Sequence, residues 1–246
     1  LISIAQRPVV VGENYQEIRD MPQALAMHIL KSLVNDASLS GGLQPELMVP
    51  IIRLSIDSFS HPDWSIRNAA LQLHGAIIPR LMGQTCKTTA ELFHKLPGLE
   101  PFLLNKLTEE TEKCQLISGG LIPSLTLICR LSPSSCNESF NASFIACLKK
   151  LIGHPVVQVR QLTAKSLLAF VPLFKTKSTT ILLCEDAEAL ANVNSQAPLR
   201  LCIRGLSRTN SLHGCILAID EFLNRCKDVA LSVEDWEIIR KAVSGL

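Results

Sequence analysis

The residues most able to do chemistry are lysines and arginines that gather between positions 149 and 208. Nine of them stand in this window against three acidic residues, which gives a local net charge of +6, while the whole chain carries +2. Cations on one surface can bind nucleic-acid phosphates, because each neutralised phosphate releases a counterion. Lysines that merely solvate outer helix faces would give the same pattern, so both interpretations stay open. The candidate phosphate-binding residues are Lys149, Lys150, Arg160, Lys165, Lys175, Lys177, Arg200, Arg204 and Arg208.

Few aromatic rings accompany these cations. Phe170 and Phe174 are the only rings in the window, so the stacking of bases has few platforms. We therefore expect recognition through shape and phosphate contacts, as for folded RNA, rather than the binding of single-stranded bases.

Arg67 and Arg160 hold the same place in two similar stretches, yet their neighbours differ. Asp63 precedes Arg67 by one helical turn and can pair with it. Val156 stands at the corresponding position before Arg160 and offers no carboxylate. A guanidinium without an internal partner suits phosphate oxygens. We therefore expect Arg67 to be structural and Arg160 to contact phosphate.

Signatures of catalysis or metal binding are missing from the sequence. It contains no glycine-rich nucleotide loop, phosphate loop, zinc-peptidase motif or nucleophile elbow. The nine cysteines include no C-x-x-C pair, which favours a reduced intracellular protein over a disulfide framework or a zinc site. Asp186 and Glu188 are predicted to be solvated surface. His74 and His213 each precede a glycine, and we expect their rings to hydrogen-bond a neighbouring helix where that glycine allows close approach.

The elements that position these residues are predicted to be helices stacked in repeats. After Pro62, residues such as Ile66, Ala69 and Leu73 recur at three- and four-residue spacing, which makes one apolar helix face. A similar stretch opens at Pro155, 93 residues further on, which is about two repeats of 40–47 residues. We therefore predict an all-α fold, a HEAT/armadillo-like α-solenoid, with these two helices on the same layer.

Composition and local signals agree with that architecture. Hydrophobic residues make up 47% of the chain and aromatic residues only 4%, which suits stacked helices better than a β-sandwich. We expect residues 1–246 to be part of one continuous solenoid, without an internal domain boundary, within a larger protein. No apolar run of about 18 residues occurs, so we expect no membrane insertion and a cytoplasmic location. Helices are expected over 22–35, 45–59, 62–82, 139–152, 155–172, 210–226 and 232–244, the last capped by Ser232 and Asp235, and loops over 175–180 and 192–198.

Four stretches, in order along the chain, resemble landmarks of one family. The resemblance covers roughly residues 50–230 and is to the family of the thyroid adenoma-associated protein and its fungal tRNA-methylation counterpart. It implies a scaffold rather than an enzyme. The stretches are Trp64–Gly83, Thr89–Leu104 with its Leu96-Pro97 and Pro101-Phe102-Leu103-Leu104 steps, Val159–Leu167 and Asn210–Gly214.

The resemblance also implies partners. The fungal member of the family is the obligate partner of an FtsJ-like methyltransferase, which methylates a ribose 2′-hydroxyl at nucleotide 32 of the tRNA anticodon loop. On that basis the chain needs no cofactor, since the methyltransferase would bind S-adenosylmethionine while the scaffold presents tRNA. An Arg-rich motif that the family ties to methylation is not found in these 246 residues.

Two other functions stay open. A protein–protein adaptor could take a partner helix or loop in the solenoid groove without any RNA, and animal members of the family have been linked to calcium-pump regulation and energy storage. An enzyme in its own right would need a pocket with a perturbed acid, base or metal. Convergence of the basic residues on one face would favour RNA over the adaptor.

Overall fold

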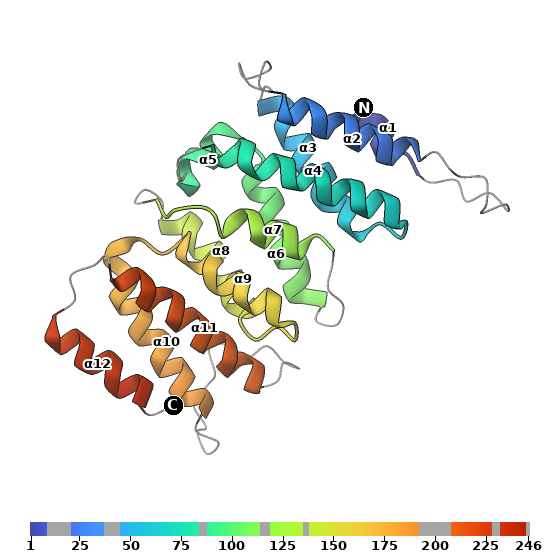
Figure 1. Cartoon of the computed structure of the whole chain (residues 1–246). Coiled ribbons are helices and arrows are strands. Elements are labelled where there is room, and N and C mark those ends of the chain that lie inside the picture. Colours follow the sequence, from blue (N-terminus) through green and yellow to red (C-terminus); the bar gives the residue numbers. More distant parts are fainter. Residues whose placement is uncertain are drawn as a thin grey trace. The chain divides into compact units, whose positions relative to one another are not determined.

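The computed structural model describes residues 1–8, 21–36, 45–83, 88–113, 119–134, 138–191, 208–227 and 232–244. Within these ranges the regular structure is helical, apart from an isolated parallel bridge between Thr88 and Ser132. This confirms the predicted all-α fold. The helices (Figure 1) are α1 (Ile2–Ala5), α2 (Pro22–Asn35), α3 (Pro45–Asp57), α4 (Trp64–Met82), α5 (Thr89–Lys95), α6 (Leu99–Lys113), α7 (Leu121–Ile128), α8 (Glu138–Leu151), α9 (Val157–Leu168), α10 (Thr176–Ala191), α11 (Arg208–Cys226) and α12 (Val233–Ser244), with short 3-10 helices η2 (Ser58–Ser60) and η3 (Leu173–Lys175).

The chain divides into two compact units whose sequences interleave. The predicted helix starts at Pro62 and Pro155 fall in different units, so their place on one layer stays a prediction. The single uninterrupted solenoid stays a prediction as well. The first unit comprises Leu1–Cys86, Glu91–Lys106 and Leu116–Ser124, and the second comprises Lys87–Ala90, Leu107–Gln115 and Leu125–Leu246.

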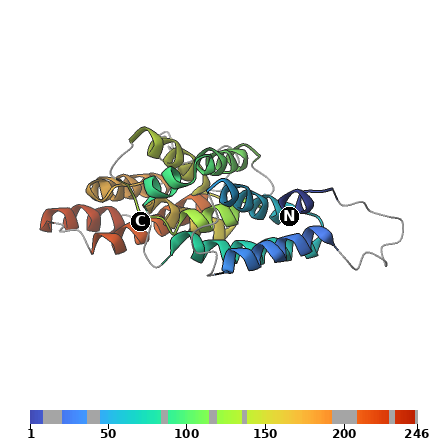
Figure 2. The same cartoon turned by 90° about the horizontal axis from the view of Figure 1, so that it is seen from above.

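Helix α4 of the first unit buries the face that the sequence predicts. It begins at Trp64 rather than Pro62, because the carboxylate of Asp63 is the N-cap and accepts hydrogen bonds from two backbone N–H groups of the first turn. Gly83, at a φ of +57°, ends the helix, since positive φ favours glycine. The helix packs against α2 and α3, and α2 and α4 lie side by side in Figure 2. Its fully buried apolar residues are Ile66, Ala69, Ala70, Leu73 and Ile77.

His74 is buried where α4 packs against α3. Its Nδ1 lies 3.3 Å from the Ser55 hydroxyl, and its ring packs edge-on against Phe59 with the ring centroids 5.7 Å apart. Burial lowers the pKa of His74 to about 4, although the Pro123 carbonyl opposes the shift. The predicted contact with a neighbouring helix is confirmed. The predicted role of the following glycine is not confirmed, because nothing lies within 4 Å of a Cβ built on Gly75.

The second unit is held together by contacts among its five long helices from α8 to α12. Helix α11 packs against α9 and α10, α10 packs against α12 (Figure 1), and α8 packs against α9. Phe144 of α8 stacks on Phe170, just after α9, with the ring centroids 4.4 Å apart. These helices and η3 carry the candidate phosphate-binding residues that the structure describes.

The prediction of a loop over residues 175–180 is wrong. These residues end η3 and begin α10 instead. Thr176 and Thr180 are fully buried and donate their hydroxyls to backbone carbonyls four residues earlier, at 3.5 Å and 2.9 Å. Bonds of this kind let threonine sit inside a helix without an unsatisfied polar group. The loop expected over 192–198 lies outside the described residues.

For two other helices, the predictions agree with the structure to different degrees. The helix expected over 155–172 spans only Val157–Leu168. At the start of α12, the predicted cap is confirmed by reciprocal bonds. The backbone N–H of Asp235 donates to Ser232 Oγ at 3.2 Å, and that of Ser232 donates to Asp235 Oδ2 at 3.0 Å.

Candidate functional site

The candidate cations that the structure describes all lie in the second unit. Arg200 and Arg204 fall outside the described residues. Among the other candidates, the arginines bind backbone carbonyls of turns and helix ends, whereas the lysines lie at or near the surface. They are Lys149 and Lys150 in the last turn of α8, Arg160 and Lys165 on α9, Lys175 at the end of η3, Lys177 on α10 and Arg208 at the start of α11.

Arg160 has internal partners, so the expectation that it lacks them is wrong. Only 5% of the residue is exposed. Its Nη1 donates to the backbone carbonyls of His154 (2.6 Å) and Pro155 (2.8 Å), and its Nε donates to Nδ1 of His213 (3.1 Å). Burial lowers the pKa of the guanidinium, and these bonds offset the cost of burying its charge. The contact also confirms the helix-to-helix hydrogen bond predicted for His213.

Arg67 repeats this arrangement in the first unit. Its Nη1 donates to the carbonyls of His61 (2.7 Å) and Pro62 (2.6 Å). In both stretches, the histidine Nδ1 accepts a backbone N–H two residues later, at 3.0 Å from Asp63 and 3.1 Å from Val156. The spacing His-Pro-x-x-x-x-Arg, visible in the sequence, therefore encodes one device that ties a turn to the following helix. Arg67 is structural, as predicted, although its partners are carbonyls.

The contact of His213 with Arg160 depends on a close approach at the next residue. A Cβ built on Gly214 would lie 1.9 Å from the carbonyl oxygen of Ile152. Helix α11 therefore meets the turn after α8 at a point with no room for a side chain. This is the role that the sequence predicts for a glycine after a histidine.

Arg208 also closes a helix end. It donates from Nη2 to the carbonyl of Ala189 at 3.0 Å and from Nε to the carbonyl of Leu190. The last carbonyls of a helix lack intrahelical partners, and a cation there also complements the helix dipole. The guanidinium is therefore engaged with the end of α10.

The candidate lysines lie at or near the surface. Lys165 and Lys177 each face a carboxylate. The Lys165 Nζ lies 3.9 Å from Glu221, and Lys177 forms an ion pair with Asp235. The pair of Lys165 is solvated and adds little stability, whereas the Asp235 side chain is only 10% exposed. Two of the candidate lysines, Lys150 and Lys165, are exposed. The other three are half-buried, namely Lys149, Lys175 and Lys177.

Lys175 adjoins an exposed aromatic ring. Its Nζ lies 5.7 Å from the centre of the Phe174 ring, within reach of a cation–π contact. Phe174 is 71% exposed, whereas Phe170, the other ring of the basic window, is fully buried. The window therefore offers one stacking platform.

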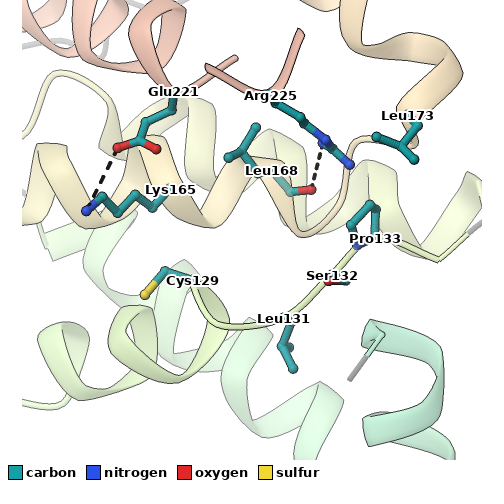
Figure 3. Close-up of a pocket in the computed structure, with 9 residues that line it drawn as sticks. All are labelled: Cys129, Leu131, Ser132, Pro133, Lys165, Leu168, Leu173, Glu221 and Arg225. Atoms are coloured by element: carbon teal, nitrogen blue, oxygen red, sulfur yellow. Dashed lines mark hydrogen bonds and ion pairs between the residues drawn. The ribbon is translucent and has the colours of Figure 1, made fainter. Parts of the chain in front are cut away.

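A cavity of about 590 Å³ lies in the second unit (Figure 3), and Leu173, the residue before Phe174, lines it. Glu221 and Arg225 of α11 lie on one side of it and the segment after α7 on the opposite side. Arg225, which sequence reasoning missed, donates from Nη1 to the carbonyls of Leu168 (3.1 Å) and Val171 (2.8 Å). These partners lie more than 50 residues away in the chain, so no local pattern could indicate them. The lining residues are Cys129, Leu131, Ser132, Pro133, Lys165, Leu168, Leu173, Glu221 and Arg225.

Burial raises the pKa of the Cys129 thiol, which therefore stays protonated and is a weak nucleophile. Within the described part of the chain, no three or more histidine, cysteine or acidic side chains cluster as metal ligands would. Among the same residues, no single helix is long and apolar enough to cross a membrane, although Val157–Leu168 and Leu173–Ala191 together, bent by 114°, reach that length and composition.

Two family models match the chain. The one described as "Trm732, C-terminal TPR repeats" matches residues 67–222, and the one described as "THADA/TRM732, DUF2428" matches residues 1–65. TPR repeats are stacked helix pairs, which agrees with the predicted α-solenoid. No solved structure is significantly similar to the chain.

Curated relatives carry names of one kind. A "tRNA (32-2′-O)-methyltransferase regulator THADA" from Gallus gallus is 28% identical over 85% of this chain and 11% of its own length. The "tRNA (32-2′-O)-methyltransferase regulator trm732" from Schizosaccharomyces pombe is 28% identical over 91% of this chain and 15% of its own. The THADA regulator from Homo sapiens is 25% identical over 85% of this chain and 11% of its own length. The chain thus spans 11–15% of the length of these relatives.

Proposed function

Because the chain belongs to the Trm732/THADA family, we propose that it is part of a non-catalytic scaffold for ribose 2′-O-methylation of tRNA. The observation that carries the proposal is the family match over residues 1–65 and 67–222, together with relatives named as regulators of a tRNA (32-2′-O)-methyltransferase. In this role an FtsJ-like methyltransferase binds S-adenosylmethionine and acts at nucleotide 32, while the scaffold holds tRNA in the cytoplasm.

The lysines of the second unit are the residues proposed to contact tRNA. Arg160 and Arg208 are engaged with backbone carbonyls, so they are less available to phosphate. A lysine Nζ on a flexible stem can leave a weak surface ion pair for a phosphate. Each such contact contributes about one unit to the slope of log Kd against log salt. The proposed contacts are Lys149, Lys150, Lys165, Lys175 and Lys177.

A protein–protein adaptor is the second candidate, and one observation favours it. Lys165 and Lys177 face Glu221 and Asp235, so part of the positive charge counted in the sequence is balanced within the second unit. An adaptor would bind the methyltransferase, or another protein partner, without binding tRNA.

The experiment is purification of the full-length protein with and without an FtsJ-like methyltransferase and tRNA. We expect no S-adenosylmethionine binding by calorimetry for the protein alone, and joint elution of protein, methyltransferase and tRNA when all are mixed. Stoichiometric cofactor binding by the protein alone would contradict the scaffold role. Elution with the methyltransferase but never with tRNA would favour the adaptor.

A further inference from the structure

The cavity of the second unit is lined by two cationic side chains, Lys165 and Arg225, and by Leu173, the residue before the exposed Phe174. We propose that it receives the phosphate of one unstacked nucleotide of an RNA loop, with Lys165 and Arg225 on the phosphate and Phe174 against the base. This inference rests on the proposed tRNA-binding function and names the site at which one nucleotide is held. It gives roles to Arg225 and Phe174 that the family match does not assign.

Arg225 lines the cavity and has donors beyond those of its two carbonyl bonds. Both of its carbonyl bonds come from Nη1, and a guanidinium has further N–H groups on Nε and Nη2. Its fork matches two phosphate oxygens. Burial lowers the pKa of Arg225, so an anion brought beside it would offset the cost of burying that charge.

Lys165 supplies the second cation and Glu221 competes for it. Their charged atoms are 3.9 Å apart, and the side chains are 53% and 28% exposed. A pair this long and this solvated is weak. The pair keeps Lys165 at the cavity. A phosphate can replace Glu221 as the partner of Lys165, because its greater charge and extra oxygen acceptors make it the stronger partner. Removing the charge of Glu221 should therefore favour the bound state.

Phe174 is the feature that separates a nucleotide from an acidic peptide. A carboxylate could use Lys165 and Arg225 but needs no ring, whereas every base has a π-face that stacks on one. Phe174 is 71% exposed and immediately follows Leu173, which lines the cavity. Lys175 lies close to the same ring and adds a further cation there.

The cavity is preformed for this use. Its volume of about 590 Å³ falls in the range of ligand sites, about 300–1,000 Å³. The wall opposite α11 is fixed at Ser132, whose carbonyl accepts the Thr89 N–H at 2.9 Å. Arg225 is fixed by its two carbonyl bonds, so little ordering is needed when the phosphate binds.

The test is the affinity of the full-length protein for a fluorescein-labelled tRNA anticodon stem-loop, measured by anisotropy over a range of salt. Phe174→Ala should weaken binding about fivefold or more and leave the salt slope unchanged, because stacking involves no counterion. Lys165→Ala should weaken binding and reduce the slope by about one unit, and Glu221→Gln should tighten binding. Arg225 is left intact because it caps the end of α9.

The controls remove similar groups elsewhere in the second unit. Lys241→Ala deletes an exposed lysine of α12, and Leu182→Ala deletes a partly exposed apolar side chain of α10. Both should bind like the wild type. Wild-type affinity in Phe174→Ala, or weaker binding in Glu221→Gln, would overturn this inference while the proposed function stands. No binding of the stem-loop by the wild-type protein would overturn both.

Discussion

Arginine and lysine do different work in this chain because their charged groups differ in shape. A planar guanidinium presents several donors in fixed directions, so one side chain can satisfy two carbonyls of a turn. Arg67, Arg160 and Arg225 each do so through a single Nη1. Counting charges along the sequence therefore overestimates the cations that are available to a phosphate.

The first prediction compares Arg160→Ala with Arg67→Ala. Arg160 is buried and makes an additional bond to His213, whereas Arg67 is half-buried. We expect a loss of about 2–4 kcal/mol in local stability for Arg160→Ala and about 1–2 kcal/mol for Arg67→Ala. Hydrogen exchange of α9 and α4 in the full-length protein measures both losses. A lower salt slope for tRNA binding in Arg160→Ala, with α9 protection unchanged, would show that the arginine contacts phosphate after all.

The second prediction concerns His74 and acid. Its pKa is about 4 in the folded state against an ordinary value of 6.5. Between those values the unfolded chain binds a proton that the folded chain excludes, so stability falls as the pH drops from 6.5 to 4. The contribution is complete above pH 6.5, and the loss reaches about 3 kcal/mol at pH 4.

His74→Gln removes this titration while keeping a polar side chain near Ser55. The pH dependence of α3 and α4 hydrogen-exchange protection, corrected for intrinsic exchange, should become flatter between pH 4 and 6.5 than in the wild type. The same slope in both proteins would mean that His74 does not titrate in this way.

At the scale of the helix, local sequence signals predict where a helix begins better than they predict how it packs against other helices. The His-Pro-x-x-x-x-Arg spacing locates α4 and α9, and Ser232 with Asp235 locates α12, because these devices act within one turn. Residues 175–180 are predicted wrongly because four of the six are threonine or serine, which are weaker helix formers. The contacts that bury Thr176 and Thr180 come from tertiary packing, which overrides such propensities.

The third prediction concerns two helical glycines. Gly214→Ala should destabilise the second unit by about 1–3 kcal/mol, since the new Cβ would clash with the Ile152 carbonyl. Gly75→Ala is the matched control, because the space around it is open, and it should be neutral or stabilise by up to about 1 kcal/mol. Exchange protection of α11 and α4 measures the two effects. Equal effects at the two positions would show that the close approach at Gly214 is not limiting.

At the scale of the whole chain, the sequence predicts the all-α class and the family, and both are confirmed. The candidate site is predictable only in part. Which cations are available depends on partners such as His213 for Arg160 and Leu168 for Arg225, which lie 53 and 57 residues away. The cavity is assembled from α9, η3, α11 and the segment after α7, so no single stretch of sequence encodes it.

The most direct test of the scaffold role is methyl transfer to the ribose at nucleotide 32 of tRNA. An FtsJ-like methyltransferase would be assayed alone, with the full-length protein, and with its variant carrying alanine at Lys149, Lys150, Lys165 and Lys175. Lys177 is kept because it pairs with Asp235 at the cap of α12.

We expect little methylation by the enzyme alone and full activity with the wild-type protein. With the variant we expect a raised KM for tRNA at nearly unchanged kcat. The protein alone should transfer no methyl group. Equal methylation with and without the protein, or methyl transfer by the protein alone, would contradict the scaffold role.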